Sequence, residues 1–342
     1  MADKTGISWA DATWNPVVGC AVVSPGCTNC YAMRDAARVI RCANGANRAS
    51  HYEGLVEPSK AGPVWTGKVA RAPDHILTKP LSWRKPRRVF VNSMGDLFHE
   101  SVPDEWIDRV FAIMVLAPQH TFQVLTKRAR RMQNYCRNVE TPRRIAEVAF
   151  ILMMKFDLDI LFGAWPLPNV WLGVTAEDQT RANERIPDLL ATPAALRFVS
   201  VEPMLGPVDL RNVSPADKYE IDALNGYDFD QGLVGPRLDW VICGGESGPD
   251  ARPMHPDWAR SLRDQCKAAR APFFFKQWGE WHPCQMIDST CYPMPGHAPF
   301  DSWTTPVFDD HPHDGWNWRR LGARRAGHLL DGREHHEFPV WP

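Results

Sequence analysis

Residues 88–118 read RVFVNSMGDLFHESVPDEWIDRVFAIMVLAP, and this stretch contains a strand, a polar turn and a helix in succession. The run 89–91 has the apolar, β-branched and aromatic side chains of a buried strand. Pro103 suits the first turn of a helix. Helical spacing then gathers one apolar face, made of Trp106, Ile107, Val110, Phe111 and Met114. A strand followed by a helix is the unit of a parallel sheet.

The same pattern recurs along the chain. Further strands are predicted within 121–128, 170–178, 196–204, 238–248 and 272–280, and their nearly continuous apolar content is typical of strands buried on both faces. Helical apolar stripes lie at 145–156 and 258–269. We therefore predict an α/β protein with a full or partial (β/α) barrel of about six or seven parallel strands. A doubly wound open sheet is the alternative.

The domain organisation follows from where this pattern stops. We expect a barrel domain over 1–280, with insertions at about 41–80 and 209–237, and a C-terminal extension over 281–342 packed on it as an irregular wrap. Within that extension, 324–338 resembles two short strands around the turn pair Asp331–Gly332.

Composition restricts the compartment and the partners. The N-terminus lacks the apolar segment of a signal peptide, and the longest apolar run, 110–117, is too short to cross a bilayer. The sequence thus predicts a cytoplasmic protein without a membrane partner. Its nine cysteines, an odd number, do not suggest a disulfide framework. The net charge is −1, yet 60–144 holds sixteen Lys/Arg against seven Asp/Glu, which predicts a possible contact with nucleic acid or simply a solvated face.

Polar side chains and glycines follow the predicted strands. In a β/α barrel such positions meet at one edge of the sheet, where functional residues gather. Each residue taken alone could equally be a helix cap or a turn residue. The candidates are Asn92, Ser93, Gly95, Asp96, Lys127, Thr175, Glu177, Glu202, Gly244, Gly245, Glu246 and Lys276. Cys243, at the end of its strand, is a further candidate as a hydrogen donor.

The stretch TWNPVVGCAVVSPGCTNCYA (13–32) places Cys20, Cys27 and Cys30 in one loop rich in glycine and proline. Thiolates are soft ligands that suit zinc or iron–sulfur clusters. A structural zinc site needs a fourth ligand, and none stands nearby at a familiar spacing. Three thiolates without a fourth favour a cluster with one metal position open. Zinc and free thiols remain alternatives.

A three-cysteine loop after a first strand, in a β/α chain of this length, resembles the radical S-adenosylmethionine superfamily. Still more closely, the stretch resembles a phage-associated, largely uncharacterised family. Further motifs shared with that family are VNSMGDLFH, LTKR, GVTAE, VSVEPMLG, CGGESG, FFKQWGEW and LLDGRE. The C-x6-C-x2-C spacing differs from the superfamily's commonest spacing, C-x3-C-x2-C.

The resemblance implies cofactors, a reaction and a reductant. Cys20, Cys27 and Cys30 would hold a [4Fe-4S] cluster, and S-adenosyl-L-methionine would chelate the fourth iron. Reduction, by a donor such as flavodoxin or ferredoxin, would release a 5′-deoxyadenosyl radical that abstracts hydrogen from a substrate. A nucleic acid or nucleotide is one substrate consistent with the resemblance, in photoproduct repair or base modification.

The resemblance also implies roles for the strand-end residues. The stretch Asn92–Asp96 would contact the amino group of the cofactor, with Ser93 and Asp96 as its polar candidates. Lys127, Thr175 and Glu177 would contact ribose and carboxylate, and the turn with Gly244, Gly245 and Glu246 would lie beside adenine. Glu202 and Lys276 would handle substrate. Two alternatives remain: a zinc-stabilised nucleic-acid-binding module without catalysis, and an interaction protein on a degenerate barrel.

Overall fold

The computed structural model describes residues 5–42, 50–156, 165–215, 220–229, 232–287, 290–297 and 316–340. Its main sheet has seven strands in the order β1-β6-β7-β8-β9-β13-β14. Helices follow most of these strands, so the predicted partial (β/α) barrel is confirmed. The contacts divide the chain into a first unit, Met1–Val174 with Asp188–Arg197, and a second unit, Thr175–Pro187 with Phe198–Pro342.

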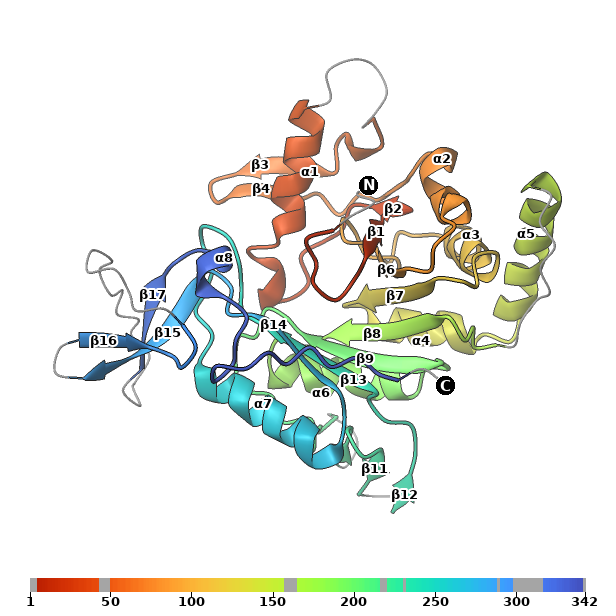
Figure 1. The fold of residues 1–342 in the computed structure, drawn as a ribbon. Helices are drawn as coiled ribbons and strands as arrows, with labels where there is room; N and C mark the ends of the chain where they lie inside the picture. Colours follow the sequence, from red (N-terminus) through yellow and green to blue (C-terminus); the bar gives the residue numbers. More distant parts are fainter. Residues whose placement is uncertain are drawn as a thin grey trace. The chain divides into compact units, whose positions relative to one another are not determined.

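The first unit carries one half of the strand–helix repeat (Figure 1). Strand β1 pairs in parallel with β6, β6 with β7, and β7 with β8. These strands span β1 (Ala12–Trp14), β6 (Arg88–Val91), β7 (Thr121–Thr126) and β8 (Val170–Thr175). The helices are α1 (Tyr31–Cys42), α2 (Asp74–Leu77), α3 (Asp104–Val115), α4 (Ala129–Arg137) and α5 (Thr141–Phe156).

Helix α3 shows why the sequence folds in this way. It begins directly after Pro103, and Asp104 and Glu105 lie in its first turn, where the helix dipole favours negative charge. Its apolar face, including Phe111, is buried, and the buried Asp108 accepts a 2.7 Å hydrogen bond from Tyr135 of α4. The helix predicted from the opening stretch is therefore present, and it packs through both apolar and polar contacts.

The predicted insertion at 41–80 forms short elements in the first unit. They are η2 (Ser50–Tyr52), the hairpin β3 (Val56–Ser59) with β4 (Gly62–Trp65), β5 (Ala70–Arg71) and η3 (Lys79–Ser82). Strand β5 pairs with β2 (Val17–Val18), which leads into the cysteine loop and its short helix η1 (Pro25–Cys27). The insertion thus supports the segment that enters the cysteine loop.

The second unit carries the other parallel strands. Strand β13 (Trp240–Gly244) pairs with β9 (Leu196–Val201) and with β14 (Phe273–Gln277), and α7 (Pro256–Ala269) connects β13 to β14 (Figure 1). Helix α6 (Gln179–Leu190) precedes β9. The predicted insertion at 209–237 forms a small sheet of β10 (Ile221–Asp222), β11 (Tyr227–Asp228) and β12 (Leu233–Val234).

The C-terminal part of the second unit lies along β14. A separate sheet has the order β16-β15-β17, from β15 (Trp281–Ile287), β16 (Thr290–Pro293) and β17 (Trp316–Arg320), and α8 (Ala323–Ala326) follows. Phe275 N then donates to His335 O at 2.7 Å, and the Trp240 indole donates to Glu337 O at 2.8 Å. Asp331 and Gly332 both adopt positive φ in the predicted turn, which a single bridge closes in place of two strands.

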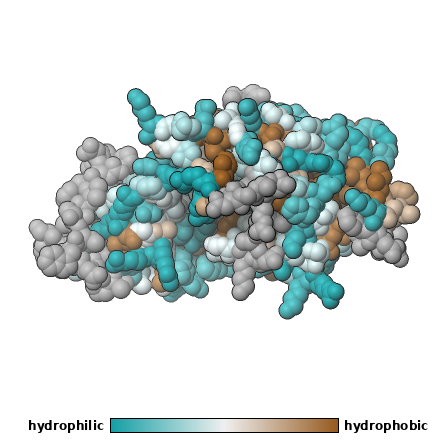
Figure 2. Space-filling model, turned by 90° about the horizontal axis from the view of Figure 1, so that it is seen from above, coloured by the Kyte–Doolittle hydropathy of each residue, from teal (hydrophilic) through white to brown (hydrophobic). Residues whose placement is uncertain are grey.

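The surface seen in Figure 2 is mainly hydrophilic, with scattered apolar patches. Helix α5 exposes Phe150, Ile151 and Met154. None of the helices in the described part of the chain combines the length and apolar content needed to cross a membrane.

Candidate functional site

Two glycines fix the cysteine loop against the turn that follows β6. Gly19 has φ +92°, and a Cβ there would lie 2.2 Å from Lys68 O. A Cβ on Gly95 would lie 2.9 Å from Gly19 O, and the two glycines form a parallel bridge. No larger residue fits this approach without moving backbone. Cys20 is therefore held beside the predicted 92–96 turn.

The three thiols of the loop have different environments. Cys27 is buried, whereas Cys20 and Cys30 are partly buried and pack against one apolar cluster that includes Val18 and Met33. Burial, helped by the Asp96 carboxylate, raises the pKa of Cys20 to about 12. Burial also raises the pKa of Cys30. Of the three thiols, Cys27 is the one whose pKa is lowered, which favours the thiolate form.

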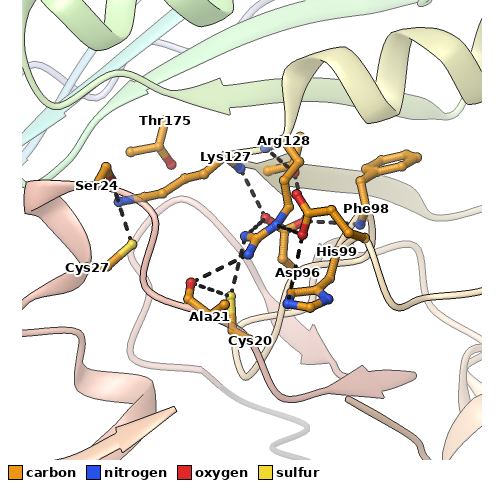
Figure 3. A network of polar contacts seen from close by, with 12 residues as sticks. Cys20, Ala21, Ser24, Cys27, Asp96, Phe98, His99, Lys127, Arg128 and Thr175 are labelled. Carbon is orange, nitrogen blue, oxygen red and sulfur yellow. Dashed lines mark hydrogen bonds and ion pairs between the residues drawn. The ribbon is translucent and has the colours of Figure 1, made fainter. Parts of the chain in front are cut away.

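Lys127 explains the acidity of Cys27. Burial would raise the pKa of this thiol, but the Lys127 ammonium and hydrogen bonds within the loop outweigh it, so the pKa is lowered. Lys127 Nζ donates to Ser24 Oγ at 3.3 Å, and Ser24 Oγ lies 3.7 Å from Cys27 Sγ (Figure 3). The lysine at the end of β7 thus stabilises the thiolate form of Cys27.

Arg128 makes a second link between β7 and the loop (Figure 3). One of its terminal nitrogens, Nη1, lies 3.5 Å from Cys20 Sγ and 3.0 Å from Asp96 Oδ2. The other, Nη2, lies 3.5 Å from Ala21 O, and Nε lies 3.1 Å from Glu100 Oε2. A planar guanidinium can make several directed bonds at once. Arg128 therefore ties Cys20 to the buried acid that follows β6.

Asp96 is the centre of this network. Its carboxylate accepts hydrogen bonds from Thr126 Oγ1 at 2.7 Å, from Phe98 N at 3.0 Å and from Lys127 N at 3.1 Å, besides the Arg128 ion pair. Its side chain is 7% exposed. Asp96 thus joins the ends of β6 and β7.

The remaining residues of the 92–96 turn are also held. Asn92 is buried with φ 64°, a conformation that asparagine tolerates in turns. Ser93 Oγ donates to Asn15 Oδ1 at 3.1 Å, and Met94 N donates to the same oxygen at 3.0 Å. Tyr31, which follows the last cysteine of the loop, donates from its hydroxyl to Ser93 O at 3.2 Å. The turn is therefore fastened to β1 and to α1.

In the first unit the structure places the cysteine loop beside the turn Asn92–Asp96 and Lys127. Sequence reasoning missed Asn15, Ser24 and Glu100, which complete the polar contacts. Ser24 stands only three residues before Cys27. This short spacing from Cys27 is the one feature of the sequence that could have indicated Ser24 as a site residue.

The described residues contain no group of three or more His, Cys, Asp or Glu side chains placed to hold one metal ion. That finding concerns a single ion. The three ligands of a four-iron cluster bind three different irons, so they need not converge on one point.

In the second unit Glu177 is fully buried against Arg185. Arg185 Nη1 lies 2.9 Å from Glu177 Oε2 and 2.8 Å from Thr175 O. The exposed fractions of the two side chains are 0% for Glu177 and 6% for Arg185. In this structure both predicted residues, Thr175 and Glu177, are therefore engaged by one arginine of α6.

A second polar group in this unit contains Glu202 and Lys276. Lys276 Nζ lies 2.9 Å from Glu202 Oε1, and Ser200 Oγ donates to Glu202 Oε2 at 3.3 Å. A Cβ on Gly244 would lie 2.7 Å from Glu202 Oε1, so the glycine makes room for the carboxylate. Glu202 and Lys276 keep some exposure, 14% and 23%. This ion pair is therefore not fully enclosed by the protein.

The other candidates of the second unit have structural contacts. The Cys243 thiol is fully buried, its Sγ lies 3.7 Å from Met204 Sδ, and burial raises its pKa. Glu246 accepts from Arg252 Nε at 2.9 Å and Nη2 at 2.6 Å. Gly245 lies against the backbone of Trp278, where a Cβ would be 1.9 Å from the carbonyl oxygen.

Much of the basic segment 60–144 is paired. Its arginines meet carboxylates in ion pairs such as Arg88–Asp11, Arg131–Asp104 and Arg144–Asp108. Exposed basic side chains of the segment that form no ion pair within the described ranges are Lys60, Lys68, Arg84, Lys85 and Arg137. The positive charge available to a partner is therefore smaller than the count of residues suggests.

Seven cysteines are free thiols: Cys20, Cys27, Cys30, Cys42, Cys136, Cys243 and Cys266. Cys284 is disulfide-bonded.

Comparison with known proteins assigns a family. A family model described as "Protein of unknown function (DUF5131)" matches residues 4–339, so the chain belongs to that family. No curated protein matches the chain. A solved structure of a family GH18 chitinase from Cycas revoluta, in complex with allosamidin, shares 10% identity, covers 70% of this chain and 81% of its own, and has a TM-score of 0.22.

Proposed function

We propose that this member of the DUF5131 family is a radical S-adenosylmethionine enzyme whose [4Fe-4S] cluster is held by Cys20, Cys27 and Cys30. The observation that carries the proposal is the pairing of the cysteine loop with two cationic side chains. Lys127 and Arg128, at the end of one parallel strand, reach towards Cys27 and Cys20. The carboxyl ends of parallel strands are where β/α barrels place their chemistry.

The donor set fits an iron–sulfur cluster in its chemistry. All three cysteines are free thiols on one loop, and thiolates are the usual ligands of such clusters. A cluster with thiolate ligands carries negative charge, which a nearby guanidinium and ammonium offset. The close packing of Gly19 on Gly95 holds the loop that presents the thiols.

When bound and reduced, the cluster with S-adenosyl-L-methionine would supply a 5′-deoxyadenosyl radical that abstracts hydrogen from the substrate. The chain's own residues bind and orient. Arg128 fixes Cys20 and the carbonyl of Ala21, and Lys127 lowers the pKa of Cys27, which favours its thiolate form. Because Asp96 already accepts from four donors, we assign it to holding this frame, and we assign contact with the cofactor's amino group to Ser93 and the turn around it.

Glu202 and Lys276 are our proposed substrate-handling pair. Their partly exposed ion pair offers one cation and one carboxylate that can bind and orient a polar group of the substrate. The roles of Thr175, Glu177, Gly244, Gly245 and Glu246 in holding the cofactor, and of Cys243 as hydrogen donor, remain predictions of the resemblance. The reductant would be a protein such as flavodoxin or ferredoxin, in a reducing cytoplasm.

A nucleic acid or nucleotide is the substrate class we propose. The exposed Lys60, Lys68, Arg84 and Lys85 support it, because unpaired cations attract phosphates. Hydrogen abstraction from such a substrate would serve either photoproduct repair or base modification.

Metal content tests the proposal. Protein prepared without oxygen should hold about four irons and as many sulfides per chain, as a [4Fe-4S] cluster requires. Cys27→Ala should lose them, whereas Cys42→Ala, an exposed cysteine outside the loop, should keep them. Zinc without sulfide would contradict the proposal and favour a nucleic-acid-binding module stabilised by zinc.

A further inference from the structure

A cavity of about 850 Å³ lies in the second unit, at the C-terminal end of α7 and the first residue of β14. Lys276 stands near the opposite, carboxyl end of the same strand. Phe273, Leu330 and Phe338 give the cavity an apolar wall. Its volume is that of a site for a small molecule. The function proposed above makes no use of it.

The cavity has positive charge that the protein does not neutralise. Lys267, Arg270 and Arg333 line it, and their side chains form no ion pair within the described parts of the chain. A fourth cation, Arg263, is paired with Asp264 at 2.9 Å and with Asp331 at 2.7 Å. Three cations are therefore available to a ligand.

Each acidic side chain of the cavity forms an ion pair or a hydrogen bond. Arg263 holds Asp264 and Asp331, and Asp331 also meets Arg260 at 2.8 Å. Glu337 accepts a hydrogen bond from Phe273 N at 3.1 Å, but its negative charge meets no cation in the described residues. Three cations without an ion pair against one such carboxylate leave the lining of the cavity with an excess of positive charge, which favours anions.

His335 supplies a second, independent observation. Its Nε2 is buried and has no hydrogen-bond partner among the described residues, although the residue lines the cavity. A buried nitrogen left unbonded costs free energy. Because this nitrogen has almost no accessible surface, an oxygen of a bound anion would reach it only after the imidazole ring turns towards the cavity.

We propose that this cavity binds a phosphate-bearing ligand of nucleotide size. Lys267, Arg270 and Arg333 would contact the phosphates, since charged donors make the strongest bonds to phosphate oxygens. His335 Nε2 would donate to another oxygen, and the aromatic wall would receive the apolar part. This assignment does not depend on the cysteine loop, so either proposal can fail alone.

Calorimetric titration of the full chain tests the proposal with three probes: ADP, inorganic pyrophosphate and a short single-stranded oligonucleotide. ADP should bind saturably, and more tightly than pyrophosphate. Arg270→Ala and Arg333→Ala should each weaken the affinity for ADP by about tenfold or more, which is the effect of losing one charged hydrogen bond. Arg237→Ala is the matched control, because it removes an exposed arginine of the same unit outside the cavity. It should leave ADP binding unchanged.

His335 provides the more specific readout. His335→Gln keeps a donor and should bind ADP more tightly than His335→Phe, while thermal unfolding shows that both variants fold. The oligonucleotide arm distinguishes the source of the phosphate: tighter binding than ADP identifies a nucleic acid strand, and weaker binding a free nucleotide. The proposal would be overturned if neither ADP nor the oligonucleotide bound saturably. It would also be overturned if Arg237→Ala weakened ADP binding as much as Arg270→Ala and Arg333→Ala do.

Discussion

The ion pair between Arg128 and Asp96 gives a prediction whose size follows from its burial. The two side chains are 5% and 7% exposed, and the charged atoms lie 3.0 Å apart. Removing one partner of a buried pair costs about 3–5 kcal/mol, because the other charge stays buried. In Arg128→Leu the Asp96 carboxylate would keep three hydrogen bonds, from Thr126, Phe98 and Lys127. We therefore expect the free energy of unfolding to fall by about 3 kcal/mol, the lower end of that range.

Urea unfolding of the metal-free protein, followed by circular dichroism, measures this loss. Arg130→Leu is the matched control: Arg130 is 75% exposed and pairs with Asp188, so its removal should cost about 1 kcal/mol or less. The double variant Asp96→Asn/Arg128→Leu should also be measured. Its loss in the free energy of unfolding should be smaller, by at least about 1 kcal/mol, than the summed losses of the two single variants, since the two groups interact directly. If Arg128→Leu were no less stable than Arg130→Leu, the assigned network would be refuted.

Three further predictions follow from contacts described above. Arg185→Met should lower the free energy of unfolding by about 3 kcal/mol, because it removes the guanidinium that pairs with the fully buried Glu177 carboxylate, and adding Glu177→Gln should restore part of the loss in urea titrations. Burial, with a smaller effect of a neighbouring histidine, lowers the pKa of His282 from 6.5 to about 4, so the unfolded chain binds more protons in this window. The stability that the neutral imidazole contributes is present above pH 6.5 and is lost as the pH falls towards 4. His282→Gln should therefore make the free energy of unfolding depend less on pH between 6.5 and 4, and an unchanged dependence would contradict the assignment. Gly95→Ala, whose Cβ would lie 2.9 Å from Gly19 O, should destabilise the protein by about 1–3 kcal/mol and reduce its iron content; full iron content would show that the loop does not need this approach.

The parallel strands could be predicted because their sequences carry the signal locally. The runs 88–91, 121–126 and 170–175 are mainly apolar, are followed by polar residues and form β6, β7 and β8. The 331–332 turn was also visible, since Asp-Gly suits positive φ at both positions. The two strands expected around it reduce to one bridge, because the flanking residues instead run along β14 or form α8.

Pairing between side chains was not visible in the sequence. The strand-end argument located Glu177 and Glu246, but nothing local showed that Arg185 and Arg252 hold them. In a related way, the excess of basic residues over 60–144 did not show which of them form ion pairs on folding. Periodicity reports which residues are buried, whereas ion pairing depends on loop geometry set by the whole fold.

The most direct test of the central claim uses protein purified and reconstituted without oxygen, then incubated with S-adenosylmethionine and dithionite. The account predicts release of 5′-deoxyadenosine by the unaltered protein and by Cys42→Ala, and none by Cys27→Ala. A protein that holds a full complement of iron and sulfide yet releases no 5′-deoxyadenosine would contradict the radical chemistry proposed for this loop.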